Sequence, residues 1–339
     1  MEQEYGGRGP VGQRPVGVAR AQKLPHAPEV GLAKRLLGRY HVTGAFWYRI
    51  HAFSMRIMPR WGVGVIVTIF TTFFFFLIFN IRRAVASNLE AVLGPCGWLE
   101  RQLRIYRTFF TFAWCLSERY ERLLGKGGFA IDIDLERWRR LFEPGTGFVM
   151  VTAHFGNFEV GSMLPAFEEA REVHVVRERE ADPEAQVFVE ELLRAAGGSH
   201  YRSHFEGEHE LQGLTLLNAL RQGGIVGVQG DRPRSGGRIV QARMFGRPFP
   251  LPDGPATLAR VAEVPLVPIF VLRVGRRHYR IEICEPIRVA SSGRRDAAVV
   301  EAMQRVADNI ELAIREAPHQ WFCFREVWPR RQRGTPATA

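Results

Sequence analysis

The most restrictive feature of the sequence is an apolar segment without any charged residue, WGVGVIVTIFTTFFFFLIFNI, between Arg60 and Arg82. As a helix, it is long enough to cross the hydrocarbon core of a bilayer or to lie within one leaflet. A buried core helix or a pair of strands is the alternative, because Val, Ile, Thr and Phe also favour strands. Arginines on both flanks suit lipid phosphates. We therefore expect a membrane-anchoring helical segment, with spanning and monotopic attachment both open.

The composition around this segment divides the chain into four parts. Residues 1–30 mix Gly, Pro, Arg and Gln without apolar periodicity, which predicts a disordered basic tail. Residues 31–95 predict membrane-associating helices, because amphipathic patterns flank the apolar segment. Residues 96–330 form the predicted main domain. Residues 331–339 are expected to be a second disordered tail.

From about Phe129 onward, patterns typical of strands and helices alternate. Apolar runs such as GFVMVTAH and GIVGVQGD predict strands, and DPEAQVFVEELLRAAG predicts a helix. The order indicates an α/β fold with a mixed, mostly parallel sheet flanked by helices. Further strands are expected in FAIDIDLERW, REVHVVRE, VPLVPIFVLRV and YRIEICEPI, and further helices in NFEVGSMLPAFEEA, LTLLNALRQ, GPATLARVAE and DAAVVEAMQRVADNIELAIREAP.

The net charge restricts the kind of partner. A formal charge of +11 favours acidic phospholipid, phosphorylated glycolipid, an acidic carrier protein or nucleic acid. Because the charge-free phenylalanine-rich segment suits a bilayer better than bases, we expect a membrane and no nucleic acid. The four cysteines have neither a CxxC pair nor ligand-like spacing, which indicates a reduced cytosolic environment.

The stretch VTAHFGNFEVG contains the candidate reactive residues. His154 follows a predicted buried strand, and sites on such sheets lie beyond the carboxyl ends of strands. Asn157 can cap a following helix, which places Glu159 in a first turn where the helix dipole favours a carboxylate. A histidine beside an ionised carboxylate can accept a proton from a hydroxyl. A capped helix beside a structural histidine explains the same residues, so the pattern alone leaves both readings open.

Five sequence blocks decide between these readings. They are HFGNFE, VVRERE, GIVGVQGDRPRSGG, MFGRPFPLPDGPATLARVAEVPLVPIFVLR and HQWFCFREVWP. In this order they resemble the bacterial late acyltransferases of lipid A synthesis, within the wider family of glycerolipid acyltransferases that carry an H-x4-D/E motif. The resemblance covers about residues 40–330. It implies a glycerolipid acyltransferase-like fold, with residues 96–330 as the acyltransferase domain.

The resemblance also implies roles for individual residues. His154 is the general base, Glu159 is its partner, and the acyl group passes directly from a thioester to a hydroxyl. The absence of a G-x-S-x-G elbow and of a catalytic cysteine block independently disfavours a covalent intermediate. The Gly-Asp-Arg sequence departs from the family's usual third block, so Asp231 either shapes the acceptor pocket or holds Arg232. The expected substrate-binding residues are Asn157, Arg177, Asp231 and Arg232.

The implied activity is that of a membrane-associated O-acyltransferase. It moves a fatty acyl chain from acyl carrier protein or coenzyme A to a hydroxyl of a lipid A precursor or related glycolipid, without a cofactor or metal. Alternatives are a phosphatidylinositol mannoside or lysophospholipid acceptor, and a non-catalytic lipid-binding homologue. The implied location is the bacterial inner membrane, with the catalytic domain facing the cytoplasm.

Two other patterns resemble a metal site and a nucleotide site, but neither site is expected. Residues 199–210 contain His200, His204 and His209, but they lie on no predicted rigid element, so we expect a polar surface loop rather than a metal site. Glycines in GGIVGVQG match neither the G-x-G-x-x-G nor the Walker pattern, so no nucleotide site is predicted.

Overall fold

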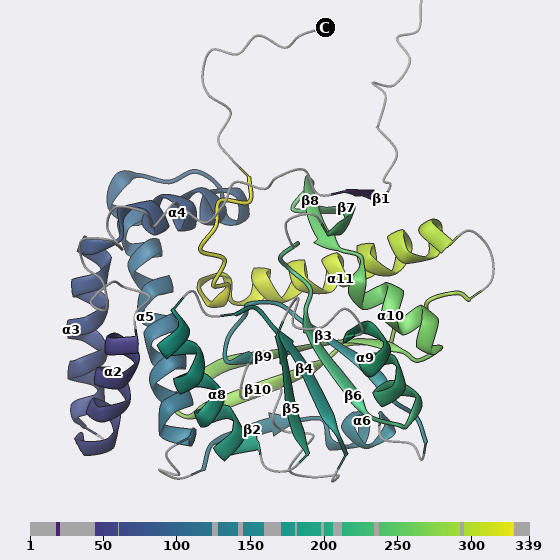
Figure 1. Cartoon of the computed structure of the whole chain (residues 1–339). Coiled ribbons are helices and arrows are strands. Elements are labelled where there is room, and N and C mark those ends of the chain that lie inside the picture. The colour runs from purple at the N-terminus through teal and green to yellow at the C-terminus, as the bar shows by residue number, and fades with distance from the viewer. Residues whose placement is uncertain are drawn as a thin grey trace, which may run out of the picture.

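The computed structural model describes residues 18–20, 45–59, 61–123, 128–141, 145–158, 171–179, 182–197, 200–205, 212–233, 237–291 and 295–328. Helices cover both faces of a central sheet, and α2, α3, α4 and α5 gather at one side of it (Figure 1). The predicted C-terminal tail, most of the predicted N-terminal tail, residues 31–44 of the predicted membrane region and nearly all of the helix expected in NFEVGSMLPAFEEA lie outside the described residues. Within the N-terminal tail, where disorder was predicted, residues Val18–Arg20 form a strand, because they pair with a strand of the folded domain.

The central sheet has seven strands in the order β2-β10-β9-β3-β6-β4-β5. Strands β9, β3, β6, β4 and β5 are parallel to one another. Strand β10 is antiparallel to β9 and parallel to β2. The predicted mixed, mostly parallel sheet flanked by helices is therefore confirmed. The strands are β2 (Ala130–Ile133), β3 (Phe148–Thr152), β4 (Val173–Arg177), β5 (Tyr201–Phe205), β6 (Ile225–Gln229), β9 (Leu266–Gly275) and β10 (His278–Ile283).

Two apolar clusters fill the space on the two faces of this sheet. Alternate residues of β3 divide between them: Val149 and Val151 belong to one cluster, and Phe148 and Met150 to the other. A central strand buried on both faces needs this continuous apolar sequence. The first cluster packs under α9 (Gln212–Arg221), α10 (Gly254–Ala262) and α11 (Arg295–Glu316), and the second under α6 (Leu135–Arg140) and α8 (Pro183–Gly197).

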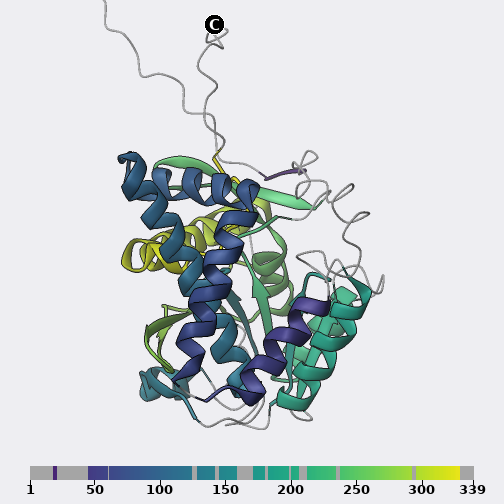
Figure 2. The same cartoon turned by 90° about the vertical axis from the view of Figure 1, so that its left-hand side faces the viewer.

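The helices at the side of the sheet are α2 (Ala45–Ile57), α3 (Gly62–Leu77), α4 (Phe79–Leu93) and α5 (Trp98–Leu123). In Figure 2, which faces this side, α2 and α3 lie in front and α4 crosses above them. The long α5 contacts α2, α3 and α4 and also α8, so it joins this group to the sheet domain. Phe75 and Phe109 pack edge to face between α3 and α5.

The apolar segment does not form the single helix that the sequence suggested. It bends by 95° at Ile78, where α3 ends and α4 begins. Beyond the bend, Arg82 packs over the Phe75 ring at 4.1 Å and donates to Gln102 on α5 over 2.6 Å. Within the described chain, no helix alone has the length and apolar composition to cross a membrane, whereas α3 and α4 meet that test together as a bent pair.

Two predictions near the sheet edges were wrong in part. FAIDIDLERW is a strand only as far as Ile133, because Asp134 then caps α6 by accepting from the backbone N–H of Arg137 over 2.9 Å. The expected surface loop at residues 199–210 contains β5, which pairs with β4. Tyr201 and Phe205 at the ends of β5 are buried. These two apolar side chains are too few to form a strand pattern that stands out in a polar sequence.

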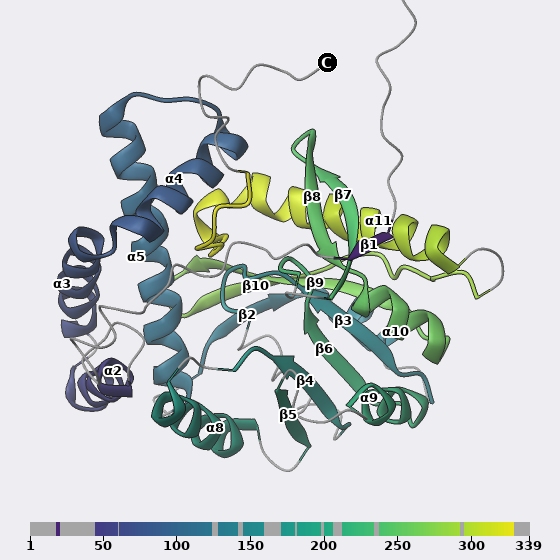
Figure 3. The same ribbon diagram turned by 45° about the horizontal axis from the view of Figure 1, so that its top comes forward.

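A second small sheet, which was not predicted, combines a short N-terminal strand with a hairpin that follows β6. It consists of β1 (Val18–Arg20), β7 (Arg238–Met244) and β8 (Arg247–Pro252) in the order β1-β7-β8. Phe245 and Gly246 form the tight turn of the hairpin with positive φ angles of 51° and 69°. Three prolines in RPFPLP argue against a central strand, but β8 is an edge strand. Figure 3 shows the hairpin beside α11.

Candidate active site

His154 lies where the sequence placed it, just beyond the carboxyl end of β3. This strand pairs with β6 on one side and β9 on the other, so its end is fixed in the centre of the sheet. Ala153 and Phe155 on either side of the histidine are fully buried, whereas the His154 side chain remains 15% exposed. The surrounding core thus holds the backbone while the ring reaches a cavity.

The turn after His154 requires a glycine. Gly156 has φ +54°, and a Cβ atom on it would lie 1.8 Å from the carbonyl oxygen of Val271. This close approach allows the backbone N–H of Asn157 to donate to that oxygen over 3.2 Å. The glycine of the HFGNFE block is therefore required by the backbone conformation of this turn, which leaves no room for a side chain.

Asp231 is the carboxylate that binds His154. Its Oδ1 lies 2.7 Å from His154 Nδ1, and its Oδ2 accepts from the backbone N–H of His154 over 3.1 Å. The indole N–H of Trp321 donates to the same Oδ2 over 3.3 Å. The Asp231 side chain is fully buried, so these donors replace the water that it has lost.

The environment favours a neutral imidazole next to a charged carboxylate. Burial lowers the pKa of His154, and the adjacent Asp231 carboxylate offsets only part of this effect. Burial alone would raise the pKa of Asp231, but His154 and the nearby Arg232 guanidinium reverse the direction and hold it below its ordinary value. With Nδ1 bonded to Asp231, the resulting arrangement presents a base through Nε2.

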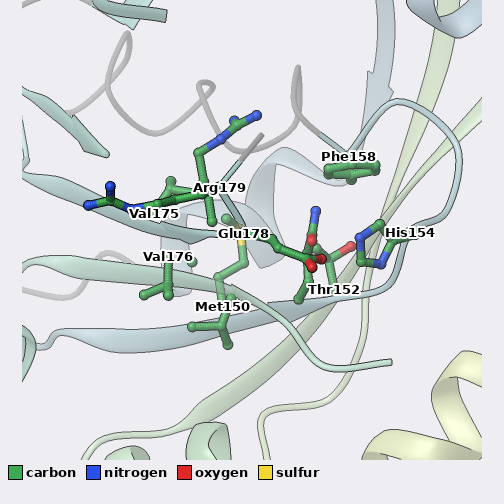
Figure 4. A pocket seen from close by; sticks show the side chains of 12 residues that line it. Met150, Thr152, His154, Phe158, Val175, Val176, Glu178 and Arg179 are labelled. Atoms are coloured by element: carbon green, nitrogen blue, oxygen red, sulfur yellow. The ribbon is translucent and has the colours of Figure 1, made fainter. Parts of the chain in front are cut away.

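A cavity of about 230 Å³ opens beside the His154 ring. It lies at the carboxyl ends of the neighbouring strands β3, β6 and β4, a common position for ligand sites in α/β sheets. In Figure 4, Met150, Val175 and Val176 lie at one part of the cavity, and Thr152, Glu178 and His154 at another, with the Phe158 ring beside the histidine. The cavity thus combines an apolar part with a polar, titratable part.

The other predicted residues occupy different surroundings. Arg177 at the end of β4 lines the cavity, beside Glu178 and Arg179. Arg232 donates to the carbonyl oxygen of Phe322 over 2.6 Å, directly next to the His154–Asp231 pair. Asn157 is buried, and its amide donates to the protein's own groups. Glu159 lies outside the described residues, so its partnership with His154 stays a prediction.

Residues near 320 complete the site, although no role was predicted for them. Trp321 pairs with Phe155 as an isolated β-bridge, and Phe322 donates its backbone N–H to the carbonyl oxygen of His154 over 2.7 Å. Gln320 accepts the backbone N–H of Gly156 on its own carbonyl oxygen. The block HQWFCFREVWP was visible as a signal, but only the fold shows that it supports the histidine.

One histidine of the segment expected to be a polar loop, His204, packs against a histidine of the neighbouring strand. His204 on β5 stacks against His174 on β4, with Nε2 of His204 2.8 Å from Nδ1 of His174. Over the part of the chain that the structure describes, no group of three histidine, cysteine or acidic side chains has the geometry to hold a metal ion. His209 lies outside that part.

Comparison with protein families gives an independent result. The family model described as "Bacterial lipid A biosynthesis acyltransferase" matches residues 33–330, which include the described helices α2–α11, the cavity and the residues near 320. A comparison with curated proteins gives no significant match.

Proposed function

The chain belongs to the bacterial lipid A biosynthesis acyltransferase family and is an acyltransferase; from this premise we propose that His154 catalyses the transfer as a general base. The observation that carries the proposal is the 2.7 Å contact between His154 Nδ1 and the buried Asp231 carboxylate, at the edge of a cavity. A histidine held in this way is oriented and has a fixed tautomer before substrate binds.

The proposed reaction needs two substrates and no covalent enzyme intermediate. Nε2 of His154 takes the proton from a hydroxyl of the lipid acceptor, and the resulting oxygen attacks the carbonyl carbon of an acyl thioester. The new C–O bond forms, the C–S bond breaks, and the departing sulfur receives the proton from the imidazolium. Asp231 stabilises the imidazolium while the proton is on the ring. Glu159, the partner predicted from the motif, remains a candidate for a further role in this step.

The cavity suits the two ends of such an acyl donor. Its apolar part, with Met150, Val175 and Val176, favours a hydrocarbon chain. Its polar part favours the thioester and the acceptor hydroxyl. We propose that Arg177 at its edge and Arg232 beside the histidine bind anionic groups of the substrates, because a guanidinium recognises phosphate well. Either acyl carrier protein or coenzyme A can supply the thioester.

We further propose that α3 associates with the cytoplasmic face of the bacterial inner membrane. Its exposed apolar residues follow a helical spacing on the side opposite the buried Val63, Val67 and Phe75. A surface of this kind is unfavourable in water and favourable in the interface of a bilayer. The exposed set is Trp61, Val65, Ile69, Phe73 and Phe76, and Phe53, Ile57, Phe79, Trp98, Leu99 and Leu103 on neighbouring helices are exposed as well.

Replacement of His154 tests the catalytic proposal. We expect His154→Ala to lower acyl transfer by about 10⁴-fold or more, because the base is lost. The assay incubates purified enzyme with a dodecanoyl thioester of carrier protein or of coenzyme A and a lipid A precursor, and follows the acylated lipid by mass spectrometry.

The matched control is His278→Ala. His278 also pairs with an aspartate, since its Nε2 lies 2.7 Å from Asp132, but this pair is exposed at the far part of the sheet. The control should retain wild-type turnover and the same melting temperature. If His154→Ala also retains full turnover, the general-base assignment is wrong. Transfer only to a phosphatidylinositol mannoside or lysophospholipid would instead change the assigned acceptor.

A further inference from the structure

A buried carboxylate on α5 collects donors from the β9–β10 hairpin. Glu118 is fully buried, and Arg273 donates to both of its oxygens, over 3.0 Å from Nε and 2.8 Å from Nη2. The backbone N–H of Arg277 adds a third bond over 3.0 Å. The Tyr279 hydroxyl donates to the same carboxylate. Such charge-assisted bonds are stronger than neutral ones and have a defined direction.

The Tyr279 hydroxyl continues this network towards the catalytic turn. Its oxygen accepts from the side-chain amide of Asn157 over 3.0 Å, and the same amide donates to the carbonyl oxygen of Cys115 over 3.2 Å. Asn157 and Tyr279 are 3% and 1% exposed, respectively, so water competes little with these bonds. Glu118 is thereby connected through a single hydroxyl to a residue three positions after His154.

The direction of each bond fixes the orientation of the Asn157 amide. A carboxylate can only accept, so the Tyr279 proton points to Glu118 and its oxygen lone pair faces Asn157. The carbonyl oxygen of Cys115 can also only accept. The Asn157 NH₂ group therefore faces both oxygens, because the reversed amide would place oxygen against oxygen.

Asn157 is also tied to the sheet by its main chain. Its backbone N–H binds the carbonyl oxygen of Val271, while Gly156 forms a bridge with Val271. The turn that carries His154 is therefore fixed through the backbone to β9 and through one side chain to β10 and α5. The side-chain anchor is the part that depends on Glu118.

We propose that Asn157 is a positioning residue, and that Glu118 acts through Tyr279 to hold it, and with it the His154 ring, in the orientation for proton transfer. This inference rests on the proposed function of His154 as general base. It assigns Asn157 to the support of the catalytic turn in place of the substrate contact that the sequence suggested.

Removal of the Tyr279 hydroxyl tests the positioning role of Asn157 without disturbing the packing of α5. Tyr279→Phe keeps the ring in the core and leaves the Arg273–Glu118 ion pair intact, so α5 stays attached to the hairpin. Asn157 keeps its bond to Cys115 but loses its connection to Glu118. We expect kcat to fall about tenfold with little change in KM or melting temperature, because small displacements of a catalytic group reduce rates strongly.

Tyr201→Phe is the matched control. Tyr201 is buried in the same apolar cluster, and its hydroxyl has no hydrogen-bond partner among the described residues. This variant should leave kcat unchanged. If Tyr279→Phe and Tyr201→Phe both lower activity and melting temperature, the loss comes from removing any buried hydroxyl. That result would overturn the proposal.

A double-mutant cycle completes the test. Asn157→Ala should lower kcat at least as much as Tyr279→Phe, and Tyr279→Phe should cause no further loss in the Asn157→Ala background. Independent, multiplied losses, or a Tyr279→Phe enzyme with wild-type kcat, would overturn the positioning role. His154→Ala in the same assay separates the two proposals. If the positioning test fails and His154→Ala is inactive, only the positioning role is wrong. If His154→Ala is fully active, the general-base role and the positioning role are both wrong.

Discussion

Asp231 binds two parts of the same residue, the ring and the backbone N–H of His154. A carboxylate that accepts from both fixes the ring relative to the chain, so rotation of the histidine would break the Nδ1 bond. The indole N–H of Trp321 adds a third bond to this carboxylate, while His154 and Arg232 hold its pKa below the ordinary value. At the scale of single residues, the pair explains both how the proposed base is oriented and why the carboxylate remains ionised.

Asp231→Asn tests this pair through the pH dependence of transfer. The pKa of His154 lies below its ordinary 6.5, so the ring loses its basic form only as the pH falls below that value. The wild-type rate should therefore decline on the acid side of pH 6.5. Because Asp231 raises the pKa of His154, the Asn variant should move this decline to lower pH, with kcat about 10⁴-fold lower.

Rate–pH profiles of purified wild-type and Asp231→Asn enzyme provide the measurement. Asp132→Asn is the control, because Asp132 pairs with the exposed His278. An unchanged profile in the Asp231 variant would contradict the proposed role of the carboxylate.

His154 was predictable from its place after an apolar strand, whereas its contact with Asp231 was not. Asp231 lies 77 residues further along the chain and meets the histidine only because β3 and β6 are neighbours in the sheet. Glu159, which the H-x4-E spacing and the family resemblance indicate as a partner, lies outside the described residues, so its role stays a prediction. Spacing along the sequence can predict partners that are close in the chain. It cannot predict a contact between two strand ends, because that contact depends on the order of the strands in the sheet.

At the scale of elements, the long strands and helices of the sheet domain were predictable because their apolar patterns are strong. The predictions of elements failed where contacts between distant parts of the chain determine the local structure. The apolar segment bends at Ile78, so that Ser87 and Asn88 of α4 can bind the chain near residues 323–328. The β7–β8 hairpin was hidden by its prolines, which an edge strand tolerates.

Asn88→Ala should be strongly destabilising for this reason. The Asn88 side chain donates to the carbonyl oxygens of Cys323 and Arg325 and accepts the backbone N–H of Val327, all at 3.0 Å or less. Their loss leaves buried groups unpaired, which should lower the free energy of unfolding by about 3 kcal/mol. Asn80→Ala on the exposed part of α4 should change it by less than about 0.5 kcal/mol. Equal unfolding midpoints in urea would show that the α4 contact adds no stability.

At the scale of the whole molecule, the apolar side formed by α2–α5 and the cavity beside His154 belong to one folded unit, because α5 contacts both the helices and the sheet. The proposed membrane contact therefore sets the position of the cavity relative to lipid. A lipid acceptor and the enzyme would then meet at the same surface.

Paired replacements on α3 test the membrane contact. Ile69→Ser with Phe73→Ser removes two exposed apolar side chains, and the loss of about 1.5–3 kcal/mol for each should weaken binding to vesicles roughly 100-fold or more. Sedimentation with vesicles of phosphatidylethanolamine and phosphatidylglycerol measures the partition. Leu214→Ser with Leu312→Ser removes two exposed leucines from α9 and α11 and should leave it unchanged. Equal partition of both pairs would exclude α3 as the contact.

The backbone bond from Phe322 to His154 has a consequence for biosynthesis. Translation produces β3 long before residues 320–328, and a nascent polypeptide without them lacks the strap that holds the reactive turn. Because domains fold as units, we expect the turn around His154 to reach its final geometry only after residues 320–328 have been synthesised and packed against it.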